Sequence, residues 1–156
     1  MSSEATTTVK VSGEAAEVAR AEALAVLALV SDENRRSRLA DLAAAVDEGV
    51  LDPEQAEGLG ELLELGLATG RIRSTYGPEG EQASLALFRR LPQGRDLSES
   101  TRELTEALSG LEGRTLEKVS VTSVGPGEYG ISISTDGYEI VLRLGRAGAR
   151  VSSIGT

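Results

Sequence analysis

The fold is decided by the stretch EYGISISTDGYEIVLRLG at residues 128–145. Apolar residues occupy alternate positions on both sides of its centre, which is the pattern of a β-strand with one buried face. The centre is Asp136-Gly137, and Asp-Gly between two alternating segments is a strong signal for a tight hairpin turn. We therefore expect residues 128–145 to form two antiparallel strands.

The same alternation continues before and after this hairpin. Two further short segments show it, one around Val119 and Val121 and one around Ala149 and Val151. A sheet with one apolar face must bury that face against another element. Within Leu97–Leu111, one set of positions recurs at alternating steps of four and three, which predicts an amphipathic helix suited to this role: Leu97, Thr101, Leu104, Leu108 and Leu111. Residues 96–156 are thus expected to form a four-stranded antiparallel meander packed on one helix.

Before residue 96 the chain is rich in alanine and leucine at helical spacing. Three helices are expected, over Gly13–Val30, from Ser31-Asp32 to Glu48, and from Asp52 to Gly70. The third has the clearest start, because Asp52 is an N-cap candidate, Pro53 suits the first helical position and Gln55 lies three residues after the cap. These residues predict a helical bundle in the N-terminal part of the chain.

Glycines interrupt the third helix at Gly58, Gly60 and Gly66. Each costs about 1 kcal/mol relative to alanine in a helix interior. Such a cost predicts a compensating feature, either a close helix–helix crossing at the glycines or a break in the helix.

Two interpretations are open for residues 71–91. In the first, Arg71–Tyr76 is a short strand or extended linker and Pro78–Leu91 is a helix, because proline suits the first helical position. In the second, Arg71–Tyr76 and Ala83–Arg89 are the strands of a hairpin, which would complete a winged helix with the preceding helices.

The remaining segments divide the chain. Met1–Ser12 is polar and is expected to be a flexible tail, although Thr6–Val11 also fits a short edge strand. Pro92-Gln93-Gly94 is expected to break the chain. The predicted organisation is an α+β protein with a tail at residues 1–12, a helical region at 13–95 and a helix with a β-meander at 96–156.

The residue types present exclude most catalytic systems. The chain has no histidine and no cysteine, so Ser–His–Asp and Cys–His catalysis and disulfides are excluded. Carboxylates could still carry acid–base or metal chemistry. The candidates are Glu61 and Glu64, three residues apart, together with Asp47. Charged stripes are normal on solvated helix faces. We therefore predict no catalytic residue, no metal site and no cofactor.

Charge is unevenly distributed along the chain, which has a net charge of −9. Residues 1–64 carry fourteen acids and five bases, whereas residues 65–156 carry eleven of each. The negative charge of residues 1–64 repels phosphate backbones and therefore disfavours nucleic acid as a partner. The longest apolar run, Ala23–Val30, is far shorter than the roughly 20 residues of a membrane span. We expect a cytoplasmic protein with no membrane association.

Arginines and aromatic rings, which are enriched at protein interfaces, cluster in one stretch. The candidate partner-binding residues are Arg71, Arg73, Tyr76, Phe88, Arg89 and Arg90. In the competing interpretation, Phe88 fills the core and the arginines pair with the surplus acids.

We expect a non-enzymatic protein-interaction protein, such as an adaptor, assembly factor or accessory subunit, which binds another protein or forms a homo-oligomer. The alternatives are a winged-helix nucleic-acid-binding regulator and a carboxylate- or metal-dependent enzyme.

Overall fold

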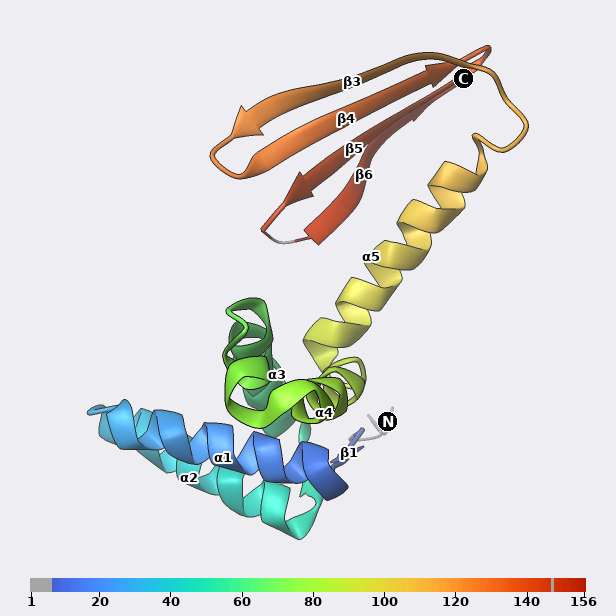
Figure 1. The fold of residues 1–156 in the computed structure, drawn as a ribbon. Helices are drawn as coiled ribbons and strands as arrows, with labels where there is room; N and C mark the ends of the chain where they lie inside the picture. Colours follow the sequence, from blue (N-terminus) through green and yellow to red (C-terminus); the bar gives the residue numbers. More distant parts are fainter. Residues whose placement is uncertain (1–6, 147) are drawn as a thin grey trace, which may run out of the picture. The chain divides into compact units, whose positions relative to one another are not determined.

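The computed structural model describes residues 7–146 and 148–156, and the chain divides into two compact units, Met1–Arg95 and Asp96–Thr156 (Figure 1). Each unit has its own cluster of buried hydrophobic residues. The first unit is mainly helical, and the second combines an antiparallel sheet with a helix. The predicted α+β class is confirmed.

The first unit consists of helices and one very short ribbon. Its elements are β1 (Val9–Lys10), α1 (Gly13–Leu29), α2 (Glu33–Glu48), β2 (Val50–Leu51), α3 (Pro53–Ala68) and α4 (Arg71–Phe88). β1 and β2 pair antiparallel, with Val9 opposite Leu51. Over the residues that the structure describes, no helix combines the length and apolar character needed to cross a membrane.

The ends of α2 and α3 follow from local sequence. Asp52 Oδ1 accepts a hydrogen bond from the Gln55 backbone N–H at 2.8 Å, and Gln55 Oε1 accepts one from the Asp52 N–H at 3.0 Å. This reciprocal pair is the predicted capping box. Asp32 caps α2 through a single bond, which its side chain accepts from the Arg35 N–H. α2 ends at Gly49, whose φ of 82° is a left-handed conformation that glycine adopts readily.

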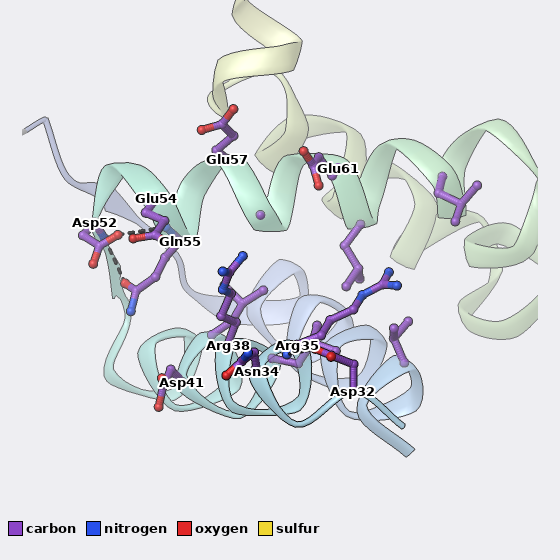
Figure 2. A pocket seen from close by; sticks show the side chains of 16 residues that line it. Asp32, Asn34, Arg35, Arg38, Asp41, Asp52, Glu54, Gln55, Glu57 and Glu61 are labelled. Carbon is purple, nitrogen blue, oxygen red and sulfur yellow. Dashed lines mark hydrogen bonds between the residues drawn. The ribbon is translucent and has the colours of Figure 1, made fainter. Parts of the chain in front are cut away.

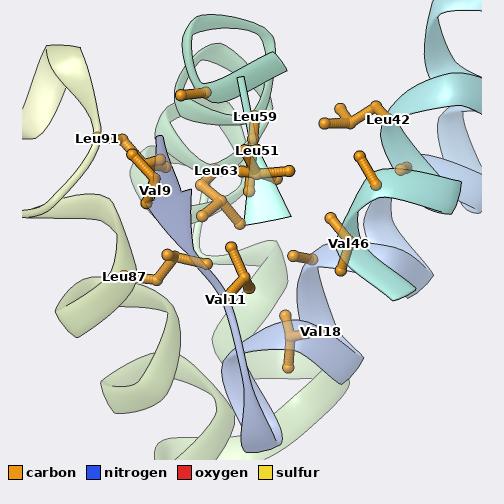
Figure 3. Close-up of a cluster of buried hydrophobic side chains, with 14 of the residues drawn as sticks. Val9, Val11, Val18, Leu42, Val46, Leu51, Leu59, Leu63, Leu87 and Leu91 are labelled. Atoms are coloured by element: carbon orange, nitrogen blue, oxygen red, sulfur yellow. The ribbon is translucent and has the colours of Figure 1, made fainter. Parts of the chain in front are cut away.

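The core of the first unit contains side chains from all of its helices and from the N-terminal segment (Figure 3). The largest fully buried apolar residues are Leu51, Leu59, Leu63, Ile72 and Leu91. Val9 and Val11 are also buried. Val9 and Val11 of the expected tail are thus part of the core, whereas Lys10 is exposed and residues 1–6 lie outside the described part of the chain.

Two of the three glycines in α3 lie where another segment comes close. A Cβ atom on Gly66 would lie 2.8 Å from Ile72 Cδ1, and one on Gly60 would lie 1.8 Å from Gln93 Oε1. A Cβ atom on Gly58 would have no such neighbour within 4 Å. The close approach expected at these glycines is therefore present at Gly60 and Gly66 and absent at Gly58.

The structure corrects the prediction for residues 71–76. Arg71–Tyr76 is helical and forms the first part of α4, which bends at Gly77 (φ 74°, ψ −176°) and resumes at Pro78. The predicted strand is therefore wrong, the predicted helix after Pro78 is confirmed, and the hairpin of a winged helix is absent from residues 71–88. The physical reason is tertiary: helical backbone places Ile72 in the core, and this burial outweighs weak local preferences.

The interruption expected at residues 92–94 lies just before them, at 89–91: α4 ends at Phe88, and residues 92–94 are the first turn of α5 (Pro92–Ser109). Proline is tolerated in the first turn of a helix, where its missing N–H would have no helical partner. The turn between α4 and α5 is tight: a Cβ atom on Gly94 would lie 1.9 Å from the Phe88 carbonyl oxygen. Glycine therefore permits a helix to begin directly after α4.

The second unit is the predicted meander with its helix. Its strands are β3 (Leu116–Gly125), β4 (Glu128–Thr135), β5 (Tyr138–Gly145) and β6 (Gly148–Gly155), paired antiparallel in that order. Leu104 and Ala107 of α5, together with Leu111 just after the helix, pack against the apolar side chains of β4, β5 and β6. The Tyr138 hydroxyl also donates a hydrogen bond to the Ala107 carbonyl oxygen at 2.9 Å. The helix is thus held on the sheet by both apolar and polar contacts.

Candidate functional site

A groove of about 1030 Å³ runs between α2 and α3, with Val26 of α1 contributing to its lining (Figure 2). Its position follows from helix pairing. α2 packs mainly on α1, and α3 packs mainly on α4, so the facing sides of α2 and α3 share few contacts. Gly58 adds to the space, because the position of its missing Cβ atom is empty. The groove is therefore a space between two helical hairpins.

The lining of the groove combines apolar and charged residues. The apolar residues are Val26, Leu39, Leu42, Leu62 and Leu65. Leu39 and Leu42 are buried, whereas Leu65 is 62% exposed. The inner wall is therefore apolar, and one leucine remains open to solvent.

Acidic residues predominate among the charged lining residues. The acids are Asp32, Asp41, Asp52, Glu54, Glu57 and Glu61, and the bases are Arg35 and Arg38. Asp32 and Asp52 are also the N-cap residues of α2 and α3. With six acids and two bases, the lining as a whole attracts cations, and an apolar wall beneath acidic residues suits the binding of an amphipathic basic segment.

The carboxylates weighed for acid–base or metal chemistry do not come together. Glu61 lines the groove, whereas Asp47 forms an ion pair with Arg20 at 2.9 Å. Glu64 is exposed on α3 and does not line the groove. Among residues 7–146 and 148–156, no three acidic side chains are grouped in a way that could hold a metal ion.

The six candidate partner-binding residues have separate environments. Phe88 is buried in the core. Arg71 and Tyr76 contact Glu22, and Arg73 pairs with Glu81 at 3.1 Å.

The last two of these residues lie after α4. Arg90 donates a hydrogen bond to the Lys10 carbonyl oxygen at 2.7 Å, and Arg89 is exposed. Most of the six thus make contacts within the chain, and their role in binding a partner stays a prediction.

A polar cluster that was not predicted lies inside the first unit. The side chain of Glu22 in α1 is 2% exposed and forms an ion pair with Arg71, which is 40% exposed. The Tyr76 hydroxyl donates a second hydrogen bond to Glu22 Oε1 at 3.1 Å. Burial, together with the negative charge of Glu22, raises the pKa of Tyr76 above its usual value. Both α4 residues thus compensate a buried carboxylate.

Glu22 could have been recognised from helical spacing. It lies four residues after Val18 and four before Val26, on the face of α1 that carries apolar residues. An acid on such a face needs a partner when it is buried. The groove has no comparable sequence signal, because it depends on how two helical hairpins are placed.

Searches of the protein-family models, the curated proteins and the solved structures found no match to this chain.

Proposed function

We propose that this chain is a non-enzymatic protein-interaction module whose groove between α2 and α3 binds a basic amphipathic segment of another protein. The observation that carries the proposal is the lining: an apolar inner wall with six acids and two bases around it. An amphipathic helix binds such a groove by placing its apolar side against the wall and its cations near the acids. An adaptor or accessory subunit needs a surface of this kind.

The groove also favours a peptide over a nucleic acid. Its lining has a surplus of four negative charges, which repel phosphates. The first unit also lacks the winged hairpin over residues 71–88. Arg35 and Arg38 also project from α2 within this acidic surrounding (Figure 2). Whether the groove prefers a positively or a negatively charged peptide is therefore a direct test of the proposal.

The test uses two fluorescent model peptides that share a row of leucines at helical spacing. One carries lysines on its polar side, and the other carries glutamates. We expect the basic peptide to bind, measured by fluorescence anisotropy, and to bind more weakly as salt concentration rises. Preferential binding of the acidic peptide, or equal binding of both, refutes the proposal.

Charge variants locate the binding site. Glu57→Lys with Glu61→Lys should weaken the basic peptide about tenfold, because each exposed reversal costs roughly 0.7 kcal/mol. Glu64→Lys is the matched control, since Glu64 is exposed on the same helix outside the groove. Arg38→Gln should tighten binding. An equal effect of Glu64→Lys and the groove variants would assign binding to overall charge.

Leucine variants test the apolar contact. Leu65→Ala should weaken the basic peptide about fivefold, since truncating an exposed leucine that becomes covered on binding loses about 1 kcal/mol. Leu29→Ala is the control, because Leu29 is 83% exposed and lies outside the groove. Both variants should leave the stability of the free protein nearly unchanged, so a loss of binding by Leu65→Ala alone reports the groove.

A further inference from the structure

One side of the sheet in the second unit is only partly covered. The register places Val119 beside Ile133 and Ile140, and Val121 beside Ile131 and Leu142. The residues of β4 and β5 in these rows pack with α5, whereas Val119 is 56% exposed and Val121 is 63% exposed. Two valines of the apolar face therefore remain open at the β3 side of the sheet.

β3 is also an edge strand. It pairs with β4 on one side and has no strand on its other side among the described residues. Such an edge presents unpaired backbone N–H and C=O groups to which another strand can be added. Register irregularities at Leu116/Lys118 and Ser123/Gly125 limit the regular part of β3 to residues 118–123. Any added strand would therefore pair with this short segment.

We propose that a second copy of this chain pairs with this edge, β3 against β3 in antiparallel orientation, with Ser120 of each copy at the two-fold axis. This register sets Val119 opposite Val121 of the second copy. The apolar row Ile133–Val119 then continues into Val121–Ile131 of the second copy. Antiparallel pairs of β-branched residues stabilise adjacent strands, and the result is one eight-stranded sheet.

The charge pattern of β3 favours this register. Lys118 is the only charged residue within residues 118–123. An axis at Lys118 would set two lysines directly opposite each other, which is destabilising. An axis at Ser120 instead sets Lys118 opposite Thr122 of the second copy.

The valines distinguish Ser120 from the next possible axis. With the axis at Ser120, the two lysines are four residues apart along the ladder, about 13 Å, which exceeds a screening length of about 8 Å. An axis at Val121 also keeps the lysines apart, but it sets Val119 opposite Ser123 and leaves one valine pair, Val121 opposite Val121, in place of two.

A cysteine at the axis tests this geometry directly, because the chain contains no cysteine of its own. In an antiparallel pair, opposite Cα atoms lie about 4.5–5.5 Å apart, which is within the range of a disulfide. Ser120→Cys should therefore form a covalent dimer under mild oxidation. Ser153→Cys, exposed on the other edge strand β6, is the matched control and should remain mostly monomeric.

Charges at the axis provide a second, independent test in the full-length protein. Ser120→Lys and Ser120→Glu should each raise the dissociation constant of the dimer about tenfold in sedimentation experiments, because each sets like charges opposite. An equimolar mixture of the two variants should recover dimerisation, since lysine then faces glutamate. Circular dichroism of each variant checks that the sheet is retained.

The outcomes decide the proposal. A dimer that is trapped by Ser120→Cys, weakened by either charge and restored by the mixture supports it. A wild-type chain that stays monomeric at about 100 μM, a concentration that populates micromolar dimers, overturns it. Equal cross-linking of Ser153→Cys, or no recovery in the mixture, overturns the β3 register. None of these results depends on the groove of the first unit, so the two proposals can fail separately.

Discussion

Replacing Arg71 with alanine should destabilise the first unit by about 3 kcal/mol. The variant leaves the side chain of Glu22, which is 2% exposed, with the Tyr76 hydroxyl as its remaining partner in the cluster. Removing one member of a buried ion pair costs about 3–5 kcal/mol, since the other charge stays buried. The lower end applies here, because Arg71 is 40% exposed and water can partly replace it.

A double-mutant cycle separates this cost from other effects of the substitution. Glu22→Gln keeps the shape of the side chain and removes its charge. In that background, Arg71→Ala should cost only about 1 kcal/mol, the loss of an ordinary hydrogen bond and some packing. The coupling energy between the two residues should thus be about 2 kcal/mol. The measurement is urea unfolding followed by far-ultraviolet circular dichroism, with the free energy of unfolding extrapolated to water.

Arg73→Ala is the matched control on the same helix. Arg73 pairs with Glu81, and its side chain is 65% exposed, so its loss should cost at most about 0.5 kcal/mol. The reasoning is refuted if Arg71→Ala costs no more than Arg73→Ala, or if its cost is the same with glutamate and glutamine at position 22.

Two further predictions concern the same unit. The pKa of Tyr76 is raised in the folded state. The stability that its protonated hydroxyl contributes is therefore complete below the unfolded pKa of about 10, and it is lost as pH rises through the folded pKa. Stability measured by urea unfolding should fall above about pH 10, and Tyr76→Phe should remove part of this fall. In thermal unfolding, Gly58→Ala should stabilise α3 by about 0.5–1 kcal/mol, because the site is open and alanine favours the helix. Gly66→Ala should instead destabilise by about 1–3 kcal/mol through contact with Ile72, and the opposite result for either glycine would contradict the packing described.

Elements with a strong local signal were predictable from the sequence. The hairpin around Asp136-Gly137 and the capping box of Asp52 and Gln55 both depend on residues close together in the chain. Short-range backbone geometry determines them. The β-meander and the start of α3 therefore match their predictions.

Residues 71–76 were not predictable in the same way. Their local preferences for helix and strand are similar, and their conformation is determined by contacts with distant residues. Ile72 packs in the core, and Arg71 contacts Glu22, which is 49 residues away in the sequence. The groove was still less predictable from the sequence, because its acids and leucines come from helices that hardly contact each other. Sequence spacing describes each helix but does not describe the space between two of them.

The three tyrosines, in a chain without tryptophan, are distributed over distinct environments. Tyr76 contacts the buried carboxylate of the helical unit, Tyr138 contacts α5, and Tyr129 is exposed on the sheet. At wavelengths that excite tyrosine but not phenylalanine, the intrinsic emission of the protein therefore comes from these three phenol rings. Replacing them with phenylalanine one at a time turns this emission into an optical probe that follows the melting of each half of the molecule without an added dye.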